Sequence, residues 1–302
     1  MWFKNLLVFK FKKPFQLSDE QLEQKLQDFA FQPCSSQDIS KIGFSNALGK
    51  HGKTLVHSAD AQFLVSITKE EKIIPASVIK ESLEEKVNQV EQTEGRSLHK
   101  KEKDSLKDEI VHTLLPRAFS RRQTTRAVIL AKHDLILVDA SSATKADEVL
   151  SLLRKAVGSL PLVPVAYTSP IQTTLTQWLT QGHAPHPFAL LDEAELKLES
   201  EAASTVKFKN QGLTEDEVLA HIEAGKVVHK LALDYADSTR FVVDLDGAIK
   251  RVKFSEEMRT EHQDSEDPAA RLDADFSLMC AELSALLAAL FDVLGEQAGA
   301  AE

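Results

Sequence analysis

Residues 96–126 read RSLHKKEKDSLKDEIVHTLLPRAFSRRQTTR, and they form the one strongly basic region of an acidic chain. Nine Lys and Arg residues stand against four Asp and Glu residues in this window, a net charge of +5, whereas the whole chain carries −10. A protein with this separation of charge can attract a polyanion to one surface and stay soluble through the rest. The window therefore predicts a polyanion-binding arm.

The first half of this window has the residue spacing of an α-helix. Three lysines fall on one face: Lys100, Lys103 and Lys107. Three apolar residues continue roughly along that face: Leu106, Ile110 and Leu114. Pro116 is expected to end the helix, because it lacks an N–H group and disfavours helical geometry at the preceding residue. Phe119 then follows in a turn flanked by arginines, where it is either exposed for a partner or tucked into the protein's own core.

Length and composition indicate a soluble protein of two or three lobes. The chain has 302 residues, of which 43% are hydrophobic and 27% are charged, a composition unlike that of disordered or membrane-spanning proteins. Lysines interrupt the apolar residues 1–15, so no signal-peptide core is expected there. Cys34 and Cys280 lie far apart without metal-ligand spacing, which favours buried free thiols in a reducing cytosol.

Alternating and helical patterns along the chain predict an α+β fold with antiparallel or mixed sheets and packed helices. Strands are expected at residues 2–11, 62–68, 126–130, 135–140, 162–165, 227–235, 240–244 and 248–254. Helices are expected at 77–92 and 169–181, and others are expected to start at Ser18, Thr144 and Thr214. The region 255–302 carries a net charge of −10, and its apolar residues recur in steps of four and three. That spacing predicts a helix packed against the chain's own sheet.

Changes in pattern predict four regions along the chain. They are an N-terminal α+β region (1–75), a helical arm with the basic helix and the Phe119 turn (76–122), a central α+β region (123–182) and a C-terminal α+β region that ends in an acidic helix (183–302). Gly95 separates the two helices of the second region, which are therefore expected to form a projecting hairpin.

Two motifs resemble sites of known chemistry but fit a structural role better. Residues 47–54, ALGKHGKT, match a relaxed phosphate-binding loop, yet a turn and a strand are expected after them where such a loop needs a helix. Residues 244–247 favour a hairpin turn over a calcium loop. His183 and His186 lie in an expected boundary loop without the spacing of metal ligands.

Charged residues of the C-terminal region allow two interpretations. The alternation KFKNQ would place Lys207, Lys209 and Gln211 on one face of a strand, either as a second DNA-facing patch or as an edge strand protected by lysines. Glu193 and Glu195 could serve as a catalytic pair of carboxylates, but the sequence offers no credible nucleophile or other catalytic partner for them. We therefore interpret them as part of a solvated helix surface. No catalytic residue, cofactor site or metal site is therefore predicted.

Five sequence blocks are long and chemically mixed: MWFKNL at 1–6, KEEKIIP at 69–75, LLPRAFSR at 114–121, HIEAGK at 221–226 and RLDADF at 271–276. Together they resemble the RdgC family of bacterial recombination-associated proteins, and they are spread over essentially the whole chain. This resemblance implies a non-enzymatic DNA-binding protein without sequence preference. It also implies a ring-shaped homodimer that encircles duplex DNA and restrains the RecA recombinase.

The resemblance and the charge pattern together give a set of expected site residues. The DNA-contacting residues are Arg96, Lys100, Lys101, Lys103, Lys107, Arg117, Arg121, Arg122, Lys207, Lys209 and Gln211. The resemblance also places Phe119 at the tip of the arm, as a gate between the protomers. In the family a basic residue tends to stand beside the glutamine, whereas this chain has Asn210. The implied partners are duplex DNA, with single-stranded DNA left open, and a second copy of the chain, in a cytoplasmic, nucleoid-associated protein that contacts no membrane.

Two other functions stay open on the sequence alone. One is a nucleotide-dependent enzyme that uses the loop of Lys53, which tight ATP binding would indicate. The other is a protein-only scaffold whose basic arm docks an acidic partner, which a failure to bind nucleic acid at low salt would indicate.

Overall fold

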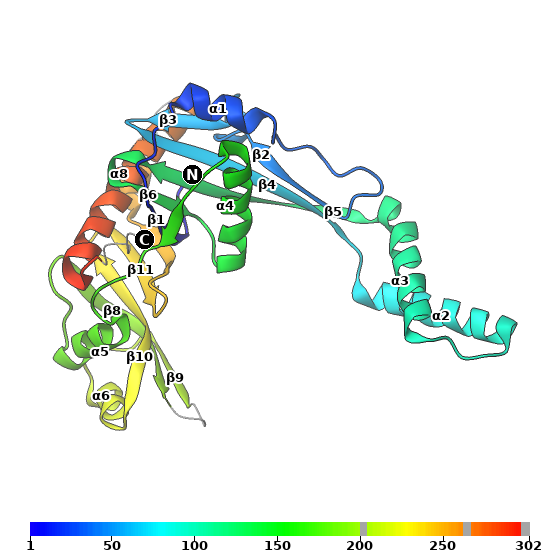
Figure 1. The fold of residues 1–302 in the computed structure, drawn as a ribbon. Coiled ribbons are helices and arrows are strands. Elements are labelled where there is room, and N and C mark those ends of the chain that lie inside the picture. Colours follow the sequence, from blue (N-terminus) through cyan, green and yellow to red (C-terminus); the bar gives the residue numbers. More distant parts are fainter. Residues whose placement is uncertain (200–203, 262–266, 297–302) are drawn as a thin grey trace. The chain divides into compact units, whose positions relative to one another are not determined.

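The computed structural model of this chain describes residues 1–199, 204–261 and 267–296 (Figure 1). The chain forms two compact units. Unit 1 comprises Met1–Asp28, Asn46–Ser66 and Thr125–Glu302, and unit 2 comprises Phe29–Ser45 and Ile67–Thr124. The sequence-based division at 182/183 falls inside unit 1.

Strands and helices alternate irregularly along the chain, as expected for an α+β fold. The strands are β1 (Asn5–Phe11), β2 (Ser40–Ser45), β3 (Val56–Ala59), β4 (Gln62–Ile73), β5 (Phe119–Leu130), β6 (Leu135–Val138), β7 (Leu162–Pro164), β8 (Phe188–Leu198), β9 (Thr205–Lys209), β10 (Lys226–Tyr235), β11 (Thr239–Asp244) and β12 (Ile249–Phe254). The α-helices are α1 (Asp19–Gln27), α2 (Ala76–Glu94), α3 (Lys100–Leu114), α4 (Ala143–Val157), α5 (Ile171–Gln181), α6 (Asp216–Glu223), α7 (Glu256–Thr260) and α8 (Pro268–Leu294). Short 3₁₀ turns are η1 (Gly49–His51), η2 (Leu115–Arg117) and η3 (Ala131–His133).

Strand β1 lies at the centre of the unit 1 sheet. On one side Asn5 and Leu6 pair with β12, and on the other side the residues from Leu7 to Lys10 pair with β6, both in antiparallel register. The strand order continues from β12 through β11, β10 and β8 to β9 at the edge. These antiparallel pairings confirm the predicted α+β class.

Helix α8 supplies much of the hydrophobic core of unit 1. Asp267 caps its N-terminus by accepting a hydrogen bond from the Ala269 amide, and Pro268 follows at the first helical position. Its predicted apolar stripe is buried: Phe276, Cys280, Leu283, Leu287, Leu290 and Leu294. These residues pack in one cluster with side chains of β1, β6 and β10. The helix is long and apolar enough to cross a membrane by length and composition alone.

Unit 2 contains the predicted helical hairpin. Helices α2 and α3 pack against each other, and Gly95 ends α2 in the left-handed region at φ 65° (Figure 1). Helix α3 ends at Leu114, as Pro116 predicts. Ile110 on this helix and Leu115 directly after it are buried. Phe119 does not lie in a turn, because it is the first residue of β5, which runs on to Leu130.

Three other local predictions are wrong. Glu193 and Glu195 lie on strand β8 and not on a helix, and Glu195 is buried. Helix α6 is capped by Glu215, one residue after the predicted Thr214, without a side-chain hydrogen bond. Of the two cysteines, both are free thiols, but only Cys280 is fully buried. For Glu193 and Glu195, ion pairs with residues of other strands decide the outcome, and local pattern does not report them.

We expect Leu283→Ala to lower the free energy of unfolding by about 2–5 kcal/mol, because it opens a cavity at a residue with 0% exposure in the centre of α8. Urea unfolding followed by circular dichroism measures the change. Ala285→Gln is the matched control, since Ala285 is exposed on the same helix and should change stability by no more than about 0.5 kcal/mol. Equal losses for both variants would contradict the assignment of this helix face to the core.

Candidate nucleic-acid interface

The strands from β8 to β12 present one face to the core and one face to solvent. Side chains on the second face, here called the sheet face, alternate with core residues such as Ala194, Leu196 and Phe208. Its charged members are Glu193, Glu195, Lys197, Lys207, Lys209, Lys230, Asp234, Arg240, Asp244, Lys250, Arg251 and Lys253. Eight are cations and four are carboxylates, so the sheet face has a net charge of +4 inside an acidic protein.

Glu195 is the most connected carboxylate of the sheet face. It is 8% exposed, and its carboxylate oxygens lie 3.0 Å from Lys230 Nζ and 3.4 Å from the Nζ atoms of Lys207 and Lys197. Burial by itself raises the pKa of this carboxyl, but the hydrogen bond and charge of Lys230, with the other lysines, outweigh it and lower the pKa to about 2. Glu195 is therefore ionised at neutral pH and holds three lysines together.

The other carboxylates of the sheet face repeat this arrangement. Asp234 accepts a 3.1 Å hydrogen bond from Arg240 Nε, and Asp244 lies 2.5 Å from Lys250 Nζ. Both aspartates are 8% exposed at the side chain, whereas Arg240 is 69% exposed and Lys250 is 32% exposed. The negative groups thus lie below the positive groups, so the surface offered to solvent is more basic than the count of charges suggests.

Arg251 extends the pattern across the sheet. Its guanidinium donates two hydrogen bonds of 2.8 Å to Glu193, and the interaction lowers the pKa of that carboxyl. Arg251 adopts φ 54°, at the irregularity where the β11–β12 register shifts. A groove of about 350 Å³ lies over this region and is lined by Asn5, Lys209 and Arg251 among others.

The predicted patch at residues 207–211 is a strand only in part. Lys207 and Lys209 lie on the exposed side of β9, at the edge of the sheet, as expected. Gln211 does not continue their face, because the strand ends at Lys209 and Asn210 turns the backbone at φ 52°. The Gln211 side chain instead donates a 3.1 Å hydrogen bond to Glu217.

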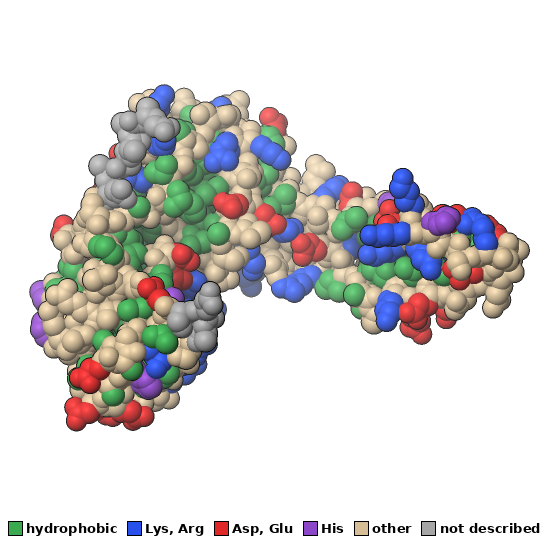
Figure 2. All heavy atoms as spheres, turned by 60° about the horizontal axis from the view of Figure 1, so that its bottom comes forward, with side chains coloured by type: hydrophobic (Ala, Val, Ile, Leu, Met, Phe, Trp, Pro, Cys, Tyr) green, Lys and Arg blue, Asp and Glu red, His purple; other side chains and the backbone are tan. Residues whose placement is uncertain are grey.

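Unit 2 carries the second concentration of positive charge, over the α2–α3 hairpin and the start of β5 (Figure 2). Five of the predicted residues are exposed and make no ion pair with another described residue: Lys100, Lys101, Lys107, Arg117 and Arg121. These five cations are available for contacts with an anionic partner.

The other predicted cations of unit 2 are already engaged. Arg96 donates two hydrogen bonds to Glu102 and lies 2.8 Å from Glu94, so its side chain fixes the connection between the two helices. The hydrogen bond from Arg96, joined by the His99 amide, lowers the pKa of Glu102 to about 2. Lys103 lies 3.5 Å from Glu91 on the neighbouring helix. These contacts favour a structural role for Arg96 and leave Lys103 half-buried.

Arg122 is also paired. Its Nε donates a 3.0 Å hydrogen bond to Glu70, whose side chain is only 5% exposed, and its guanidinium lies 5.5 Å from the centre of the Phe31 ring. Arg122 therefore ties β5 to β4 within unit 2. Predicting these pairings from sequence was not possible, since Glu70 and Arg122 are far apart along the chain.

The loop that resembles a phosphate-binding motif has the wrong surroundings for that role. Gly49–His51 form a single 3₁₀ turn, and strand β3 follows where a phosphate-binding loop needs a helix N-terminus. Residues 244–247 form the predicted hairpin turn, in which Asp244 accepts hydrogen bonds from the amides of Asp246 and Ala248. Across the described ranges, no group of three or more His, Cys, Asp or Glu side chains is placed to hold a metal ion.

Sequence reasoning found two of the sheet-face cations and missed six. Lys230, Arg240, Lys250 and Arg251 lie on strands that were predicted, but no local signal shows that their side chains meet. The alternation of Glu193, Glu195 and Lys197 with apolar residues would have revealed β8, had the carboxylates not been interpreted as helix surface.

Comparison with known proteins decides the family. The family model described as "Putative exonuclease, RdgC" matches residues 1–297. The chain belongs to the RdgC family. Curated relatives from Shewanella oneidensis, Shewanella halifaxensis and Shewanella loihica are 60%, 58% and 60% identical over 297 residues, and each match covers 98% of both chains. All three carry the name Recombination-associated protein RdgC. The resemblance inferred from the five sequence blocks is thereby confirmed.

We expect Glu195→Gln to destabilise this RdgC-family protein at neutral pH by about 1–3 kcal/mol, because the charged hydrogen bonds to three lysines are lost. The folded-state pKa of Glu195 is about 2 and its ordinary value is 4.5, so the stabilisation is complete above pH 4.5 and disappears as the pH falls toward 2. Urea unfolding of wild type and variant at several pH values measures the difference.

The matched control for this prediction is Glu223→Gln, an exposed carboxylate at the end of α6 that makes no ion pair with a described residue. The difference between wild type and Glu195→Gln should shrink between pH 4.5 and 2, whereas the control should show little difference at any pH. A difference that stayed constant down to pH 2 would show that Glu195 is not the titrating group.

Proposed function

We propose that this protein binds DNA without sequence preference, through the sheet face of unit 1 and the exposed cations of unit 2. The observation that carries the proposal is the sheet face, where buried carboxylates hold exposed Lys and Arg side chains in a net positive array. Phosphate contacts from such side chains position a protein on DNA but carry no sequence information. Duplex DNA is the proposed ligand, and single-stranded DNA shares the same phosphates.

A role in recombination is supported by the name that the curated relatives carry. We propose that the protein restrains the RecA recombinase by occupying DNA. A protein that covers the phosphates of a duplex competes with any other protein that needs them, so direct contact with the recombinase is not required. The proposed location is the nucleoid.

We further propose that the protein acts as a homodimer that closes around the duplex, with Phe119 in the contact between protomers. Phe119 is 86% exposed, and Ile73 and Ile39 are also exposed in unit 2. Thr68 lies 3.1 Å from Thr124, and Glu70 pairs with Arg122. In antiparallel strands, each step forward along β4 is matched by a step back along β5. If the pairing of Thr68 with Thr124 and of Glu70 with Arg122 continues to the end of β4, Ile73 lies opposite Phe119. An exposed apolar patch of this kind marks a protein-protein contact.

Three other functions predict different outcomes for a DNA-binding assay. The family description names an exonuclease, which would shorten labelled duplex when Mg²⁺ is supplied. A nucleotide-dependent enzyme would need tight ATP binding that Lys53→Ala abolishes, but the loop lacks the helix that follows in such sites. A protein-only scaffold would bind no nucleic acid at low salt. The proposal predicts that DNA is bound, that it stays intact with Mg²⁺ and that binding does not depend on ATP. Each of these results argues against one of the three other functions.

DNA affinity should depend strongly on salt. If each protomer places about three cations on phosphates, a dimer displaces counterions from about six, and log K should fall with log salt at a slope of about −5. The triple substitution of Lys100, Lys101 and Lys107 by alanine should weaken binding and make the slope shallower, because these three lysines are exposed and make no ion pair with another described residue. Fluorescence anisotropy with labelled duplex at several salt concentrations measures both quantities.

The control for the salt experiment is a triple alanine substitution at Lys12, Lys13 and Lys25, which are exposed and lie outside both basic surfaces. It removes the same formal charge and should leave the slope near the wild-type value. A flat salt response of the wild-type protein would overturn the proposed DNA binding. An affinity loss in the first triple variant at unchanged slope would indicate a folding defect.

Phe119→Ala should speed dissociation from closed-circular DNA. Burying one Phe side chain stabilises a contact by roughly 1.5–3 kcal/mol. A twofold-symmetric homodimer contains two copies of Phe119, so the contribution to the contact between protomers would double. A closed ring cannot slide off a circle, so dissociation from circles requires the protomers to separate at this contact. Dissociation rates from circular and linear duplex of equal length, at one salt concentration, provide the measurement.

The fold should tolerate this substitution, because the side chain is 86% exposed. Phe119→Leu keeps an apolar side chain and should retain most of the wild-type difference between circles and linear DNA. An alanine variant that folds and leaves circles as slowly as wild type would exclude Phe119 as the gate. Unfolding of the variant would instead make Phe119 a core residue.

A further inference from the structure

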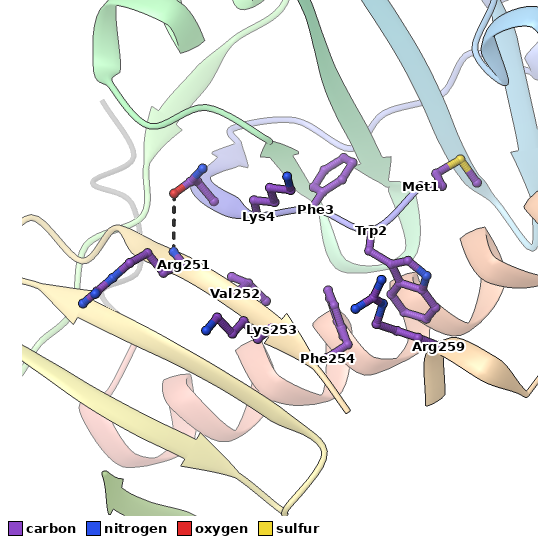
Figure 3. Close-up of a pocket in the computed structure, with 10 residues that line it drawn as sticks. Met1, Trp2, Phe3, Lys4, Arg251, Val252, Lys253, Phe254 and Arg259 are labelled. Carbon is purple, nitrogen blue, oxygen red and sulfur yellow. Dashed lines mark hydrogen bonds between the residues drawn. The ribbon is translucent and has the colours of Figure 1, made fainter. Parts of the chain in front are cut away.

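A pocket of about 740 Å³ opens beside the N-terminal end of β1, within the size range of about 300–1,000 Å³ that is typical of small-ligand sites (Figure 3). Trp2 and Phe254 form its aromatic part, with ring centres 4.7 Å apart. Phe254 is buried, whereas Trp2 is half-buried. Figure 3 shows Arg259 beside the Trp2 ring.

The rim of this pocket is positively charged. Lys4, Lys253 and Arg259 line it, are exposed, and make no ion pair with any residue that the structure describes. None of the residues lining the pocket is acidic. The pocket therefore joins an aromatic ring to unneutralised cations, a combination that suits a flat aromatic group attached to an anion.

The pocket continues into the sheet face. Arg251 and Asn5 line both this pocket and the groove over Glu193 and Lys209, and the Arg251 amide donates a 3.4 Å hydrogen bond to the Asn5 side chain. Lys253 belongs to the sheet face and to the pocket rim. A phosphate chain that lies on the sheet face would thus have a neighbouring site for one of its bases.

We propose that this pocket receives an unpaired nucleotide of DNA bound to the sheet face, with the base stacked on Trp2 and the adjoining phosphates on Lys253 and Arg259. The inference rests on the proposed DNA binding and adds to it a preference for DNA that offers an unpaired base. A base-paired duplex presents its phosphates but keeps its bases stacked, so it engages the cations and leaves the pocket empty.

An acidic peptide with an apolar end is the rival occupant, because it also combines negative charge with apolar surface. Two observations favour the nucleotide. The pocket is lined by the indole of a half-buried tryptophan, and every base can stack on an aromatic ring. The pocket also opens onto a long cationic surface, whose size matches a phosphate chain better than a short peptide end.

Fluorescence of Trp2 gives a direct test. The chain has two tryptophans, and Trp178 is buried in α5, so Trp178→Phe leaves Trp2 as the single reporter. The ligands are a blunt duplex, the same duplex with an unpaired thymidine overhang, and the same duplex with an abasic overhang. The abasic overhang adds the same phosphates without a base. The expected result is quenching and tighter binding with the thymidine overhang only.

Two variants of the full chain test the residues. Trp2→Ala should remove the preference for the thymidine overhang over the abasic overhang, a loss of about 5- to 150-fold in affinity for the thymidine overhang. Binding of the blunt duplex should stay unchanged. Lys253→Ala with Arg259→Ala, two exposed positions, should weaken binding of both overhangs and reduce the salt slope by about 1.4 for the single-stranded part. Arg154→Ala, an exposed cation on α4, is the control and should change neither.

The outcomes separate this inference from the proposed function. If the blunt duplex binds with the expected salt dependence, but both overhangs bind alike and leave Trp2 unquenched, the pocket does not take a base and the inference is wrong. If no DNA binds, the proposed function itself fails, and this inference with it. If an acidic peptide ending in Phe quenches Trp2 and thymidine does not, the pocket belongs to a protein partner.

Discussion

The antiparallel pairing of β1 with strands on both of its sides is the contact on which unit 1 depends. Asn5 and Leu6 pair with β12, and the next residues pair with β6, so one short strand joins both halves of the sheet. The core side of β1, with Leu6 and Val8, packs in the same cluster as α8. The residues that precede the strand form the wall of the pocket, so strand pairing and pocket geometry are set by the same segment.

The charge arrangement shows how an acidic protein can present a basic surface. A net charge of −10 keeps the molecule soluble and repels polyanions from most of its surface. On the sheet face three of the four carboxylates, Glu195, Asp234 and Asp244, are buried, and their lysine and arginine partners are more exposed, so each pair orients a cation toward solvent. These pairs therefore hold cations in fixed positions as well as contributing to stability.

Local signals in the sequence predicted much of the fold, and long-range contacts account for what they missed. Capping at Ser18, the glycine at 95 and the stripe of α8 depend on residues close in sequence, and all three were confirmed. Strand β8 was missed because Glu193 and Glu195 suggested a solvated helix, whereas their partners lie on β9, β10 and β12. The charge of the arm could be counted, but the pairing of Arg96 and Arg122 could not.

The central place of β1 also affects the order in which the protein can fold during synthesis. Asn5 and Leu6 are synthesised long before Lys250 and Ile249, the residues with which they pair. Until then Asn5 and Leu6 lack their β12 partners, although Phe9, Lys10 and Phe11 can already pair with β7, and part of the core surface beneath α8 has no native partner. Unpaired strand edges and exposed apolar surface promote aggregation of nascent chains. The growing chain is therefore most exposed to aggregation before β12 and α8 have been made.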